Sequence, residues 1–472
     1  MQILLINLRI DPVMAYGKKF ARLGAVMPPL GLCYLAGVLR KDGHQVKILD
    51  ANLLGLSQEE VLKKIKEEAP GLIGLYATTL GINGAEELAK KIKQAFAKIT
   101  VVIGGPHISG YGKETLSWPY FDFGIIGEGE RSLPELVKHI ENGNKDFSGL
   151  RGLVYRKESQ IIKNEASEPI AELDSLPFPA RDLLPDLKRY HPKKMFYKKL
   201  PLVHIFTSRG CPFQCTFCQT PFGKKARFHS AEYVADEIEL LVRKFGAKEI
   251  KINDDTFNLV EERVLKIFDI LKKKGIEIGW ACNLRVDTVK SKRFFEEIKK
   301  RGCWLVGFGL ESGNQEVLDT LKKKITLEQA RQVCGWARES GLKVQASFII
   351  GNPTDTEETI RQTIDFARSL PLHYPSFAFM TPFPGTELWQ TACQFGNLSY
   401  EKFSDLRVSH SPKFIPKGLS AEKMRQLYSQ AYRAVYLNPR MIIRQLANIN
   451  SFSEGLRLCS AAFSFLDFRK DR

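Results

Sequence analysis

Two stretches of this chain alternate short β-rich runs with longer amphipathic segments, and this alternation constrains the fold most. In the first stretch, residues 1–143, segments such as "AEELAKKIKQAFAK" have helical periodicity and separate five hydrophobic runs. The runs are "ILLINL", "QVKILDA", "LIGLYAT", "TVVIGGP" and "FGIIGEG". Strands that alternate with helices are typical of a parallel sheet covered on both faces. The sequence therefore predicts an α/β, doubly wound, Rossmann-like first domain.

The second stretch begins near residue 201 and contains six further strand candidates, each followed by loop or helical sequence. These are "LVHIFTS", "EIKIND", "IGWACN", "WLVGFGL", "VQASFII" and "SFAFM". Six βα units fit an open, partial (β/α)6 barrel better than the closed eightfold barrel. A hairpin-like pair, "GLVYRK" and "IIKN", and the proline-rich "LDSLPFPARDLLP" lie between the two stretches. We expect a first domain over 1–145, a linker over 146–200, the barrel over 201–395 and a helical region over 396–472.

Three of the nine cysteines cluster in the loop after the first barrel strand. Cys211, Cys215 and Cys218 have the spacing C-x3-C-x2-C, which lets one loop wrap three thiolates around a cuboidal 4Fe-4S cluster. Three ligands leave one iron open to a substrate. A zinc knuckle is the alternative, but His204 and His229, the nearby histidines, fit no familiar zinc pattern. The isolated cysteines, to which we assign no metal, are Cys33, Cys282, Cys303, Cys334, Cys393 and Cys459.

Composition limits where the protein works and what it binds. The sequence begins without a signal-peptide pattern and contains no run of eighteen apolar residues, so we expect a cytoplasmic protein with reduced thiols. A formal net charge of +17 points toward an anionic partner, which could be a nucleic acid, an acidic substrate or a membrane surface. Charge alone does not choose among them.

The cysteine loop, with Phe217 before the last cysteine, resembles the signature of the radical S-adenosylmethionine (SAM) superfamily. The resemblance implies that the methionine moiety of SAM chelates the open iron. It also implies that the reduced cluster cleaves SAM to a 5'-deoxyadenosyl radical, which removes hydrogen from a substrate. An external electron donor, a flavodoxin or a ferredoxin, is implied as well.

Three further segments resemble SAM-binding segments of that superfamily. "GFGLESGNQEVL" places Glu311 and Ser312 near the ribose or methionine end of SAM, and "SFIIGNPTDT" places Gly351 and Pro353 near its adenine. In "KINDDTF", the resemblance places Asn253, Asp254 and Asp255 near the methionine ammonium. An ordinary barrel ion pair is the alternative for Asp254 or Glu311, and a strained turn is the alternative for Gly351.

The first domain resembles the cobalamin-binding domain that precedes the radical barrel in one large subfamily. The resemblance rests on "MPPLGLCYLAGVLRKDGHQVKILDA", "GGPHISG" and "GEGE". Residues expected near cobalamin follow the strands: Thr78, Thr79, Gly104, Gly105, His107, Gly127 and Glu128. The Asp-x-His-x-x-Gly signature that supplies histidine to cobalt elsewhere is missing, since the first loop has Asp11 and Gly17 but no histidine. Cobalamin is then expected with its own base displaced and no protein histidine on cobalt; an empty domain is the alternative.

This resemblance implies a cobalamin-dependent enzyme that methylates an unactivated carbon of a small hydrophobic or tetrapyrrole-like substrate. The subfamily also includes the anaerobic magnesium-protoporphyrin cyclase, so radical oxidative cyclisation is a second hypothesis. RNA modification of the methylthiotransferase type is a third, and we disfavour nucleic acid because that class carries three more cysteines in its first domain, where this chain has only Cys33. A non-catalytic cobalamin sensor is the least favoured hypothesis, because a sensor would not need a cysteine loop that leaves one iron open.

The C-terminal tail suggests where the substrate resides. From residue 433 onward, basic residues interleave with apolar ones, giving amphipathic helices broken near Pro439. Such helices either cap a barrel or lie at an anionic membrane surface. Because hopanoid methylases and the porphyrin cyclase of the subfamily act on hydrophobic molecules, the resemblance allows a peripheral enzyme at the inner membrane.

Overall fold

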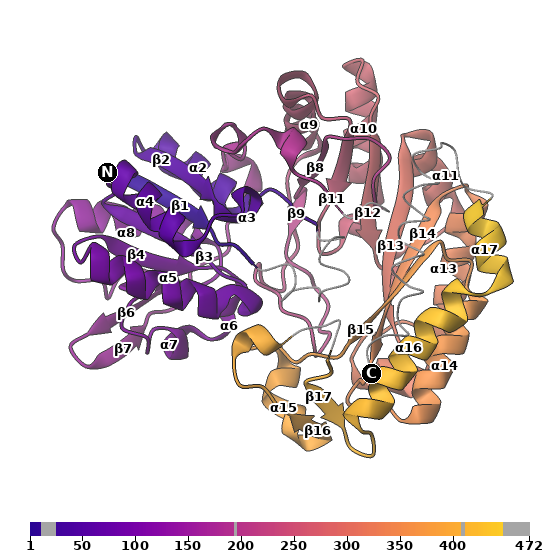
Figure 1. The fold of residues 1–472 in the computed structure, drawn as a ribbon. Coiled ribbons are helices and arrows are strands. Elements are labelled where there is room, and N and C mark those ends of the chain that lie inside the picture. The colour runs from indigo at the N-terminus through magenta and orange to yellow at the C-terminus, as the bar shows by residue number, and fades with distance from the viewer. Residues whose placement is uncertain (11–24, 193–195, 407–410, 447–472) are drawn as a thin grey trace.

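The first domain is built on a seven-stranded sheet that contains all five predicted parallel strands. The computed structural model describes residues 1–10, 25–192, 196–406 and 411–446. The parallel strands are β1 (Gln2–Asn7), β2 (Gln45–Asp50), β3 (Leu72–Tyr76), β4 (Thr100–Gly104) and β5 (Phe123–Ile125). The sheet order is β2-β1-β3-β4-β5-β6-β7, with β6 and β7 described below. The prediction of a doubly wound first domain is confirmed (Figure 1).

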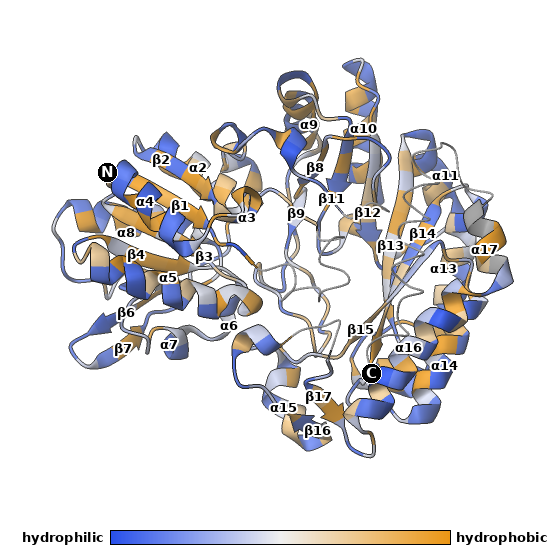
Figure 2. Cartoon of the chain, in the orientation of Figure 1, coloured by the Kyte–Doolittle hydropathy of each residue, from blue (hydrophilic) through white to orange (hydrophobic). Residues whose placement is uncertain are grey.

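Helices cover both faces of this sheet because successive strand residues point to opposite sides. Ile3 and Leu5 of β1 pack under α2 (Leu30–Lys41) and α8 (Gly129–Glu141), as one buried cluster. Leu4 and Ile6 pack on the other side, under α4 (Gln58–Glu68) and α5 (Ile82–Ala95). Figure 2 shows hydrophobic strands flanked by helices that carry both hydrophobic and hydrophilic residues. The parallel strands therefore present hydrophobic side chains to both faces.

The hairpin that the sequence places in the linker extends the first sheet instead. β6 (Leu153–Lys157) pairs antiparallel with β5, and β7 (Gln160–Lys163) pairs antiparallel with β6. β5 has only three residues, and without β6 its edge would expose unpaired backbone groups. The connecting segment that remains begins at residue 164, and its described part includes 3-10 helices at Leu173–Ser175, Arg181–Leu183 and Leu187–Arg189.

The second domain is a six-stranded parallel sheet with the predicted strand sequence. Its strands are β8 (Leu202–Ile205), β11 (Glu249–Ile252), β12 (Gly279–Leu284), β13 (Cys303–Glu311), β14 (Lys343–Ile350) and β15 (Tyr374–Phe379). The order β15-β14-β13-β12-β11-β8 leaves β8 and β15 as edges, so the barrel is open, as expected. The covering helices are α9 (Ala231–Phe245), α10 (Glu261–Lys273), α11 (Lys292–Lys300), α12 (Gln315–Thr320), α13 (Leu327–Glu339) and α14 (Glu357–Ser369).

The C-terminal region packs along the outside of the barrel. It contains α15 (Glu387–Phe395), the antiparallel pair β16 (Gly396–Leu398) and β17 (Phe414–Pro416), α16 (Ala421–Tyr436) and α17 (Pro439–Leu446). One face of α16, with Met424, Leu427 and Val435, is buried in the barrel's hydrophobic cluster, next to α14 (Figure 1). Residues 447–472 lie outside the described residues. Among the described residues, no helix has the length and apolar character that a membrane crossing needs.

Candidate cofactor-binding site

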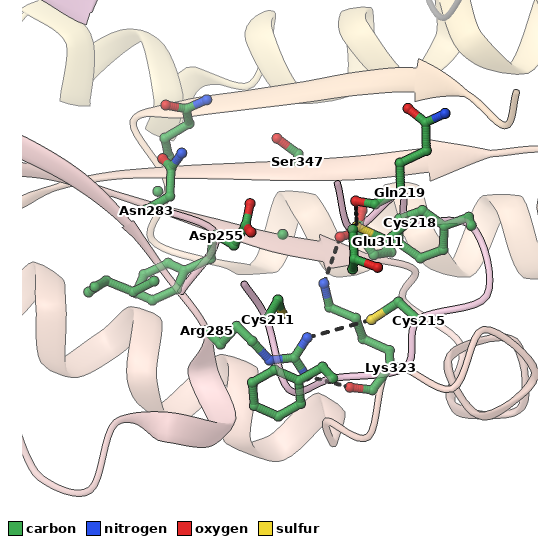
Figure 3. Close-up of a pocket in the computed structure, with 18 residues that line it drawn as sticks. Cys211, Cys215, Cys218, Gln219, Asp255, Asn283, Arg285, Glu311, Lys323 and Ser347 are labelled. Carbon is green, nitrogen blue, oxygen red and sulfur yellow. Dashed lines mark hydrogen bonds and ion pairs between the residues drawn. The ribbon is translucent and has the colours of Figure 1, made fainter. Parts of the chain in front are cut away.

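Three thiols lie together in a pocket at the carboxyl ends of the barrel strands. After β8 the chain forms β9 (Ser208–Arg209), runs through residues 210–226, which we call the cysteine loop, and returns as β10 (Arg227–Phe228). β9 and β10 pair antiparallel and form the stem of the loop. The pocket has a volume of about 360 Å³, and the thiols that line it belong to Cys211, Cys215 and Cys218 (Figure 3).

A glycine lets the cysteine loop close tightly on itself. Gly210 has a φ of +85°, and a β-carbon there would lie 2.3 Å from the carbonyl oxygen of Lys225. Only glycine fits such a close backbone approach. The next residue, Cys211, donates its backbone N–H to the carbonyl oxygen of Gly223 at 3.2 Å. The loop therefore folds back on itself where the first cysteine begins.

The opposite walls of the pocket come from the barrel strands and the loops that follow them. These walls include Asp255, Asn283, Arg285, Gly307, Gly309, Glu311, Lys323, Gln345 and Ser347, while the cysteine loop adds Phe213, Phe217 and Gln219. Gly307 and Gly309 leave space, because a β-carbon at 307 would lie 2.6 Å from Asn283 Oδ1. At 309 it would lie 2.4 Å from Glu311 Oε1. Figure 3 shows Asn283 and Ser347 on the side away from Cys211 and Cys215.

Two cations, each paired with a carboxylate, lie among the cysteines. Arg285 Nη1 is 3.6 Å from Cys215 Sγ, and its guanidinium pairs with Asp287 at 2.9 Å and lies over the Phe213 ring. Lys323 donates to Glu311 at 2.8 Å, and both side chains are about nine-tenths buried. Arg285 and Lys323 thus place two positive charges on the wall of the pocket that the three cysteines also line. Neither Arg285 nor Lys323 was singled out from the sequence.

The predicted SAM residues divide into those that line the pocket and those that do not. Glu311 lines it with a φ of +64°, an unusual conformation for a residue other than glycine. Phe217 and Asp255 also line it. Burial, and then the Asp254 carboxylate, raise the pKa of Asp255. Desolvation, and then Cys215 and Asp255, raise the pKa of the Cys218 thiol to about 11, so metal binding must displace its proton.

Asp254 ties strand ends together rather than lining the pocket. Its carboxylate accepts hydrogen bonds from the Thr207 N–H at 2.6 Å, the Thr207 hydroxyl at 2.5 Å and the Ser208 hydroxyl at 2.7 Å. Burial raises the pKa of Asp254, while these hydrogen bonds act in the opposite direction. Asp254 therefore fixes the chain that leads into the cysteine loop. Asn253, its neighbour, is not among the lining residues.

The remaining predicted SAM residues are engaged in packing outside this pocket. Ser312 is fully buried, with its hydroxyl 3.2 Å from that of Thr363. Gly351 has a φ of +82°, and a β-carbon there would lie 2.2 Å from Cε of Met424 in α16. Pro353 follows in the same buried turn, which the Asp355 carboxylate closes by accepting the N–H of Gly351 at 2.9 Å.

The residues predicted near cobalamin follow β3, β4 and β5 at one edge of the first sheet. Thr78 and Thr79 follow β3, Gly104 ends β4 with Gly105 next, and Gly127 follows β5. Gly105 has a φ of +114°, and a β-carbon there would lie 2.6 Å from the carbonyl oxygen of Ala77. The glycine turn thus brings two neighbouring loops into contact. Asp11 and Gly17, in the loop after β1, lie outside the described residues.

His107 is turned into the protein. Its ring is fully buried, its Nδ1 lies 3.2 Å from Thr79 Oγ1, and it packs edge-on against Phe403 at 4.7 Å between centroids. Burial lowers the pKa of His107 to about 4, so the ring is neutral at neutral pH. Nδ1 thus faces Thr79, while Nε2 is buried without a hydrogen-bond partner among the described residues.

Glu128 follows β5, as predicted, and its carboxylate forms a buried ion pair. Both of its carboxylate oxygens accept from the Arg227 guanidinium, one of them at 3.1 Å, and Oε2 also accepts the Ile170 N–H. The partner Arg227 lies in the stem of the cysteine loop, which the sequence pattern of the first domain could not indicate. Glu128 thus joins the two domains.

The arrangement of the thiols fits a cluster better than a single zinc ion. In the described part of the chain, no three His, Cys, Asp or Glu side chains converge as a one-ion site requires. The three cysteines instead line a wider cavity, and no fourth cysteine is among its lining residues. Cys33, Cys282, Cys303 and Cys334 are buried elsewhere, Cys393 is exposed, and Cys459 lies outside the described residues.

Comparison with known proteins gives matches over nearly the whole chain. Residues 205–367 match the radical SAM superfamily, and residues 20–137 match the B12 binding domain. An uncharacterised methyltransferase of Pyrococcus horikoshii is 35% identical over 461 residues, 96% of each chain. The anaerobic magnesium-protoporphyrin IX monomethyl ester cyclase of Rubrivivax gelatinosus is 27% identical, over 95% of this chain and 80% of the relative.

A solved structure shares the whole fold. The radical S-adenosylmethionine methyltransferase TsrM of Kitasatospora setae aligns with a TM-score of 0.72 and 18% identity, over 98% of both chains. At this identity the likeness concerns the fold. The arrangement of a first α/β sheet, an open barrel and a C-terminal region is therefore shared by both proteins.

Removing one cysteine should empty the metal site. We expect the anaerobically reconstituted protein to bind about four irons per chain, and Cys215→Ala to lose most of them, because each thiolate holds one corner of a cluster. Cys393→Ala, which removes an exposed thiol outside the pocket, is the matched control and should keep its iron. Iron and zinc are measured by elemental analysis. Stoichiometric zinc in the wild-type protein would contradict the assignment.

Proposed function

This chain belongs to the radical SAM enzymes that carry an N-terminal B12-binding domain, and we propose that it methylates an unactivated carbon of a small molecule. The observation that carries the proposal is the pocket itself, in which three cysteines of one loop face the charged and amide side chains of the barrel strands. Three thiolates without a fourth leave room for SAM on the cluster.

The proposed cofactors are a 4Fe-4S cluster, SAM and cobalamin. When bound, the cluster supplies the electron that cleaves SAM, and cobalamin carries the transferred methyl group. Cys211, Cys215 and Cys218 would hold the cluster. Thr78, Thr79, Gly104, Gly105, His107, Gly127 and Glu128 would lie at the cobalamin site. We propose no protein histidine on cobalt because the first domain lacks the Asp-x-His-x-x-Gly signature. An external flavodoxin or ferredoxin would deliver the electron.

The chain's own residues complement the two charges of the methionine end of SAM. Asp255 and Glu311 offer carboxylates to its ammonium group, and Lys323 and Arg285 offer positive charge to its carboxylate. The Phe213 and Phe217 rings cover the loop side of the pocket, where water would otherwise reach the cluster. Asn283, Gln345 and Ser347 supply hydrogen bonds farther inside the barrel. These residues orient and shield, while the cofactors carry the bond cleavage.

Radical oxidative cyclisation is the second candidate function. It is favoured by the 27% identity to the magnesium-protoporphyrin cyclase over 95% of this chain. The same cysteine loop and first domain serve either reaction, since both begin with SAM cleavage. RNA modification is disfavoured, because Cys33 is the only cysteine of the first domain and is buried in α2.

Metabolite comparison tests the reaction directly. We expect a deletion strain to accumulate a compound that lacks one methyl group relative to a product of the parent strain, by high-resolution mass spectrometry. The purified protein with SAM and reduced flavodoxin should convert the former compound into the latter. A parent product that instead has one more ring, with loss of hydrogen and no added carbon, would favour cyclisation over methylation.

Lys323 provides a test of the SAM site. Lys323→Met leaves the buried Glu311 carboxylate unpaired, and we expect SAM to bind about tenfold more weakly or worse, since hydrogen bonds to charged groups contribute about 1.5–3 kcal/mol. Lys322→Met is the matched control, because Lys322 is half exposed and pairs with Glu387 on the surface. Equilibrium dialysis with SAM measures both variants. Equal affinity in the two variants would remove Lys323 and Glu311 from the SAM site.

A hydrophobic substrate taken from a membrane surface is part of the proposal. Exposed apolar side chains occur at the end of α16 and in α17: Leu437, Ile442 and Ile443. α16 just before them is anchored in the barrel core, so the amphipathic pattern serves packing up to Tyr436. A net charge of +17 would favour an anionic membrane surface.

Vesicle binding tests this part of the proposal. We expect the protein to sediment with anionic liposomes at low salt, and Ile443→Glu to weaken this binding, because a charge on the apolar face opposes insertion. Val260→Glu is the control, since Val260 is an exposed apolar residue at the start of α10. If the wild-type protein stays in the supernatant, a water-soluble substrate becomes the better expectation.

A further inference from the structure

Two buried arginines face each other across the stem of the cysteine loop. Arg209 of β9 pairs directly with Arg227 of β10, and both side chains are almost fully buried. Like charges directly opposite each other on paired strands repel, and burial strengthens the repulsion. The stem that carries the three cysteines therefore cannot close unless other groups neutralise these two cations.

The neutralising groups come from the first domain. Glu130 accepts from Arg209 Nη2 at 2.6 Å, while Glu128 pairs with Arg227 and lies 3.5 Å from Arg209 Nη1. Both carboxylates lie at the start of α8, where the helix dipole also favours negative charge. Two arginines and two glutamates thus form one buried group of charges. The second domain supplies both positive charges, and the first domain supplies both negative charges.

The remaining contacts of the arginines tie this group to the loop and the connecting segment. Arg227 Nη1 donates to the carbonyl oxygen of Ile170 at 2.6 Å, and Nη2 donates to that of Phe222 at 2.9 Å. The Arg209 guanidinium lies between the rings of Tyr34 in α2 and Phe222, 4.9 and 5.1 Å from their centroids. Phe222 belongs to the cysteine loop, so the arginines hold the loop as well as its stem.

We propose that Glu128 and Glu130 are positioning residues for the cysteine loop, so that the first domain sets the geometry of the cluster site in the second. The inference rests on the proposed function only in that the loop holds a cluster. The glutamates reach that loop through Arg209 and Arg227 and touch neither the cysteines nor the pocket. A change at the start of α8 is thereby transmitted to Cys211, two residues beyond Arg209.

A second buried ion pair serves as a control that distinguishes an effect on the position of the cysteine loop from a general loss of stability. Arg181 and Glu237 form an ion pair of the same chemistry, 2.7 Å long and equally buried, between the connecting segment and α9. This pair does not contact the cysteine loop. Glu237→Gln should therefore lower the melting temperature and leave the cysteine loop unchanged. Glu130→Gln should lower the melting temperature and also disturb the cysteine loop.

The experiment compares these two variants in the full-length protein. After anaerobic reconstitution, we expect Glu130→Gln to hold less than half of the wild-type iron and to change the electron paramagnetic resonance signal of the reduced cluster. Glu237→Gln should match the wild-type protein in both. Glu130→Asp, which keeps the carboxylate, should restore most of the iron and the signal. Unchanged iron and signal in Glu130→Gln would overturn the inference.

A second readout does not depend on iron. Lys224 and Lys225 are exposed trypsin sites inside the cysteine loop. In the metal-free protein, trypsin should cut there several-fold faster in Glu130→Gln than in Glu237→Gln. Equal cutting of the two variants would overturn the inference, whether or not the wild-type protein takes up iron. A wild-type protein that takes up no iron would count against the proposed function and not against this inference. Should Glu130→Gln fail to fold, Arg209→Lys compared with Arg181→Lys gives the same test, since lysine lacks the planar fork.

Discussion

The buried contact between two glutamates of the first domain and two arginines of the second is the interaction on which the rest of the structure depends. Arg209 and Arg227 form the base of the loop that carries Cys211, Cys215 and Cys218, and Glu128 and Glu130 neutralise them. A buried charge without its partner costs several kcal/mol, about the margin by which a domain is stable. The two domains are therefore joined by a buried contact at the base of the cysteine loop.

The pocket at the open end of the barrel is shaped by a few residues of the barrel strands. Gly307 and Gly309 remove side chains from β13, so that Asn283, Glu311 and Lys323 can occupy the space. Glu311 adopts a left-handed backbone conformation, a strain that functional sites commonly retain. The cysteine loop makes a second contact, in which the Gln219 side chain donates to the carbonyl oxygen of Pro384 at 2.7 Å. A β-carbon on Gly110 of the first domain would lie 2.4 Å from that same oxygen.

Strands and cysteines could be predicted because their signals are local. Each parallel strand is a short hydrophobic run with its own flanking turns, and the cysteine spacing lies within eight residues. Arg285 and Lys323 were missed because nothing near them in the sequence marks a charge that faces a thiol across the barrel. The ion pair of Glu128 with Arg227 could not be predicted, because the two residues are 99 positions apart in the sequence. The sequence predicts that β6 and β7 pair with each other, but it does not show which sheet edge the hairpin joins. For this reason the hairpin was assigned to the linker, whereas it pairs with β5 of the first sheet.

Anomalous X-ray diffraction from crystals of the anaerobically reconstituted protein, recorded at the iron and cobalt absorption edges, tests the central claim most directly. The account predicts an iron peak beside Cys211, Cys215 and Cys218. It also predicts a cobalt peak at the carboxyl ends of β3, β4 and β5, on the side that faces the pocket, with no histidine on the metal. An iron peak absent from the cysteine loop, or a cobalt peak bonded to His107, would contradict it.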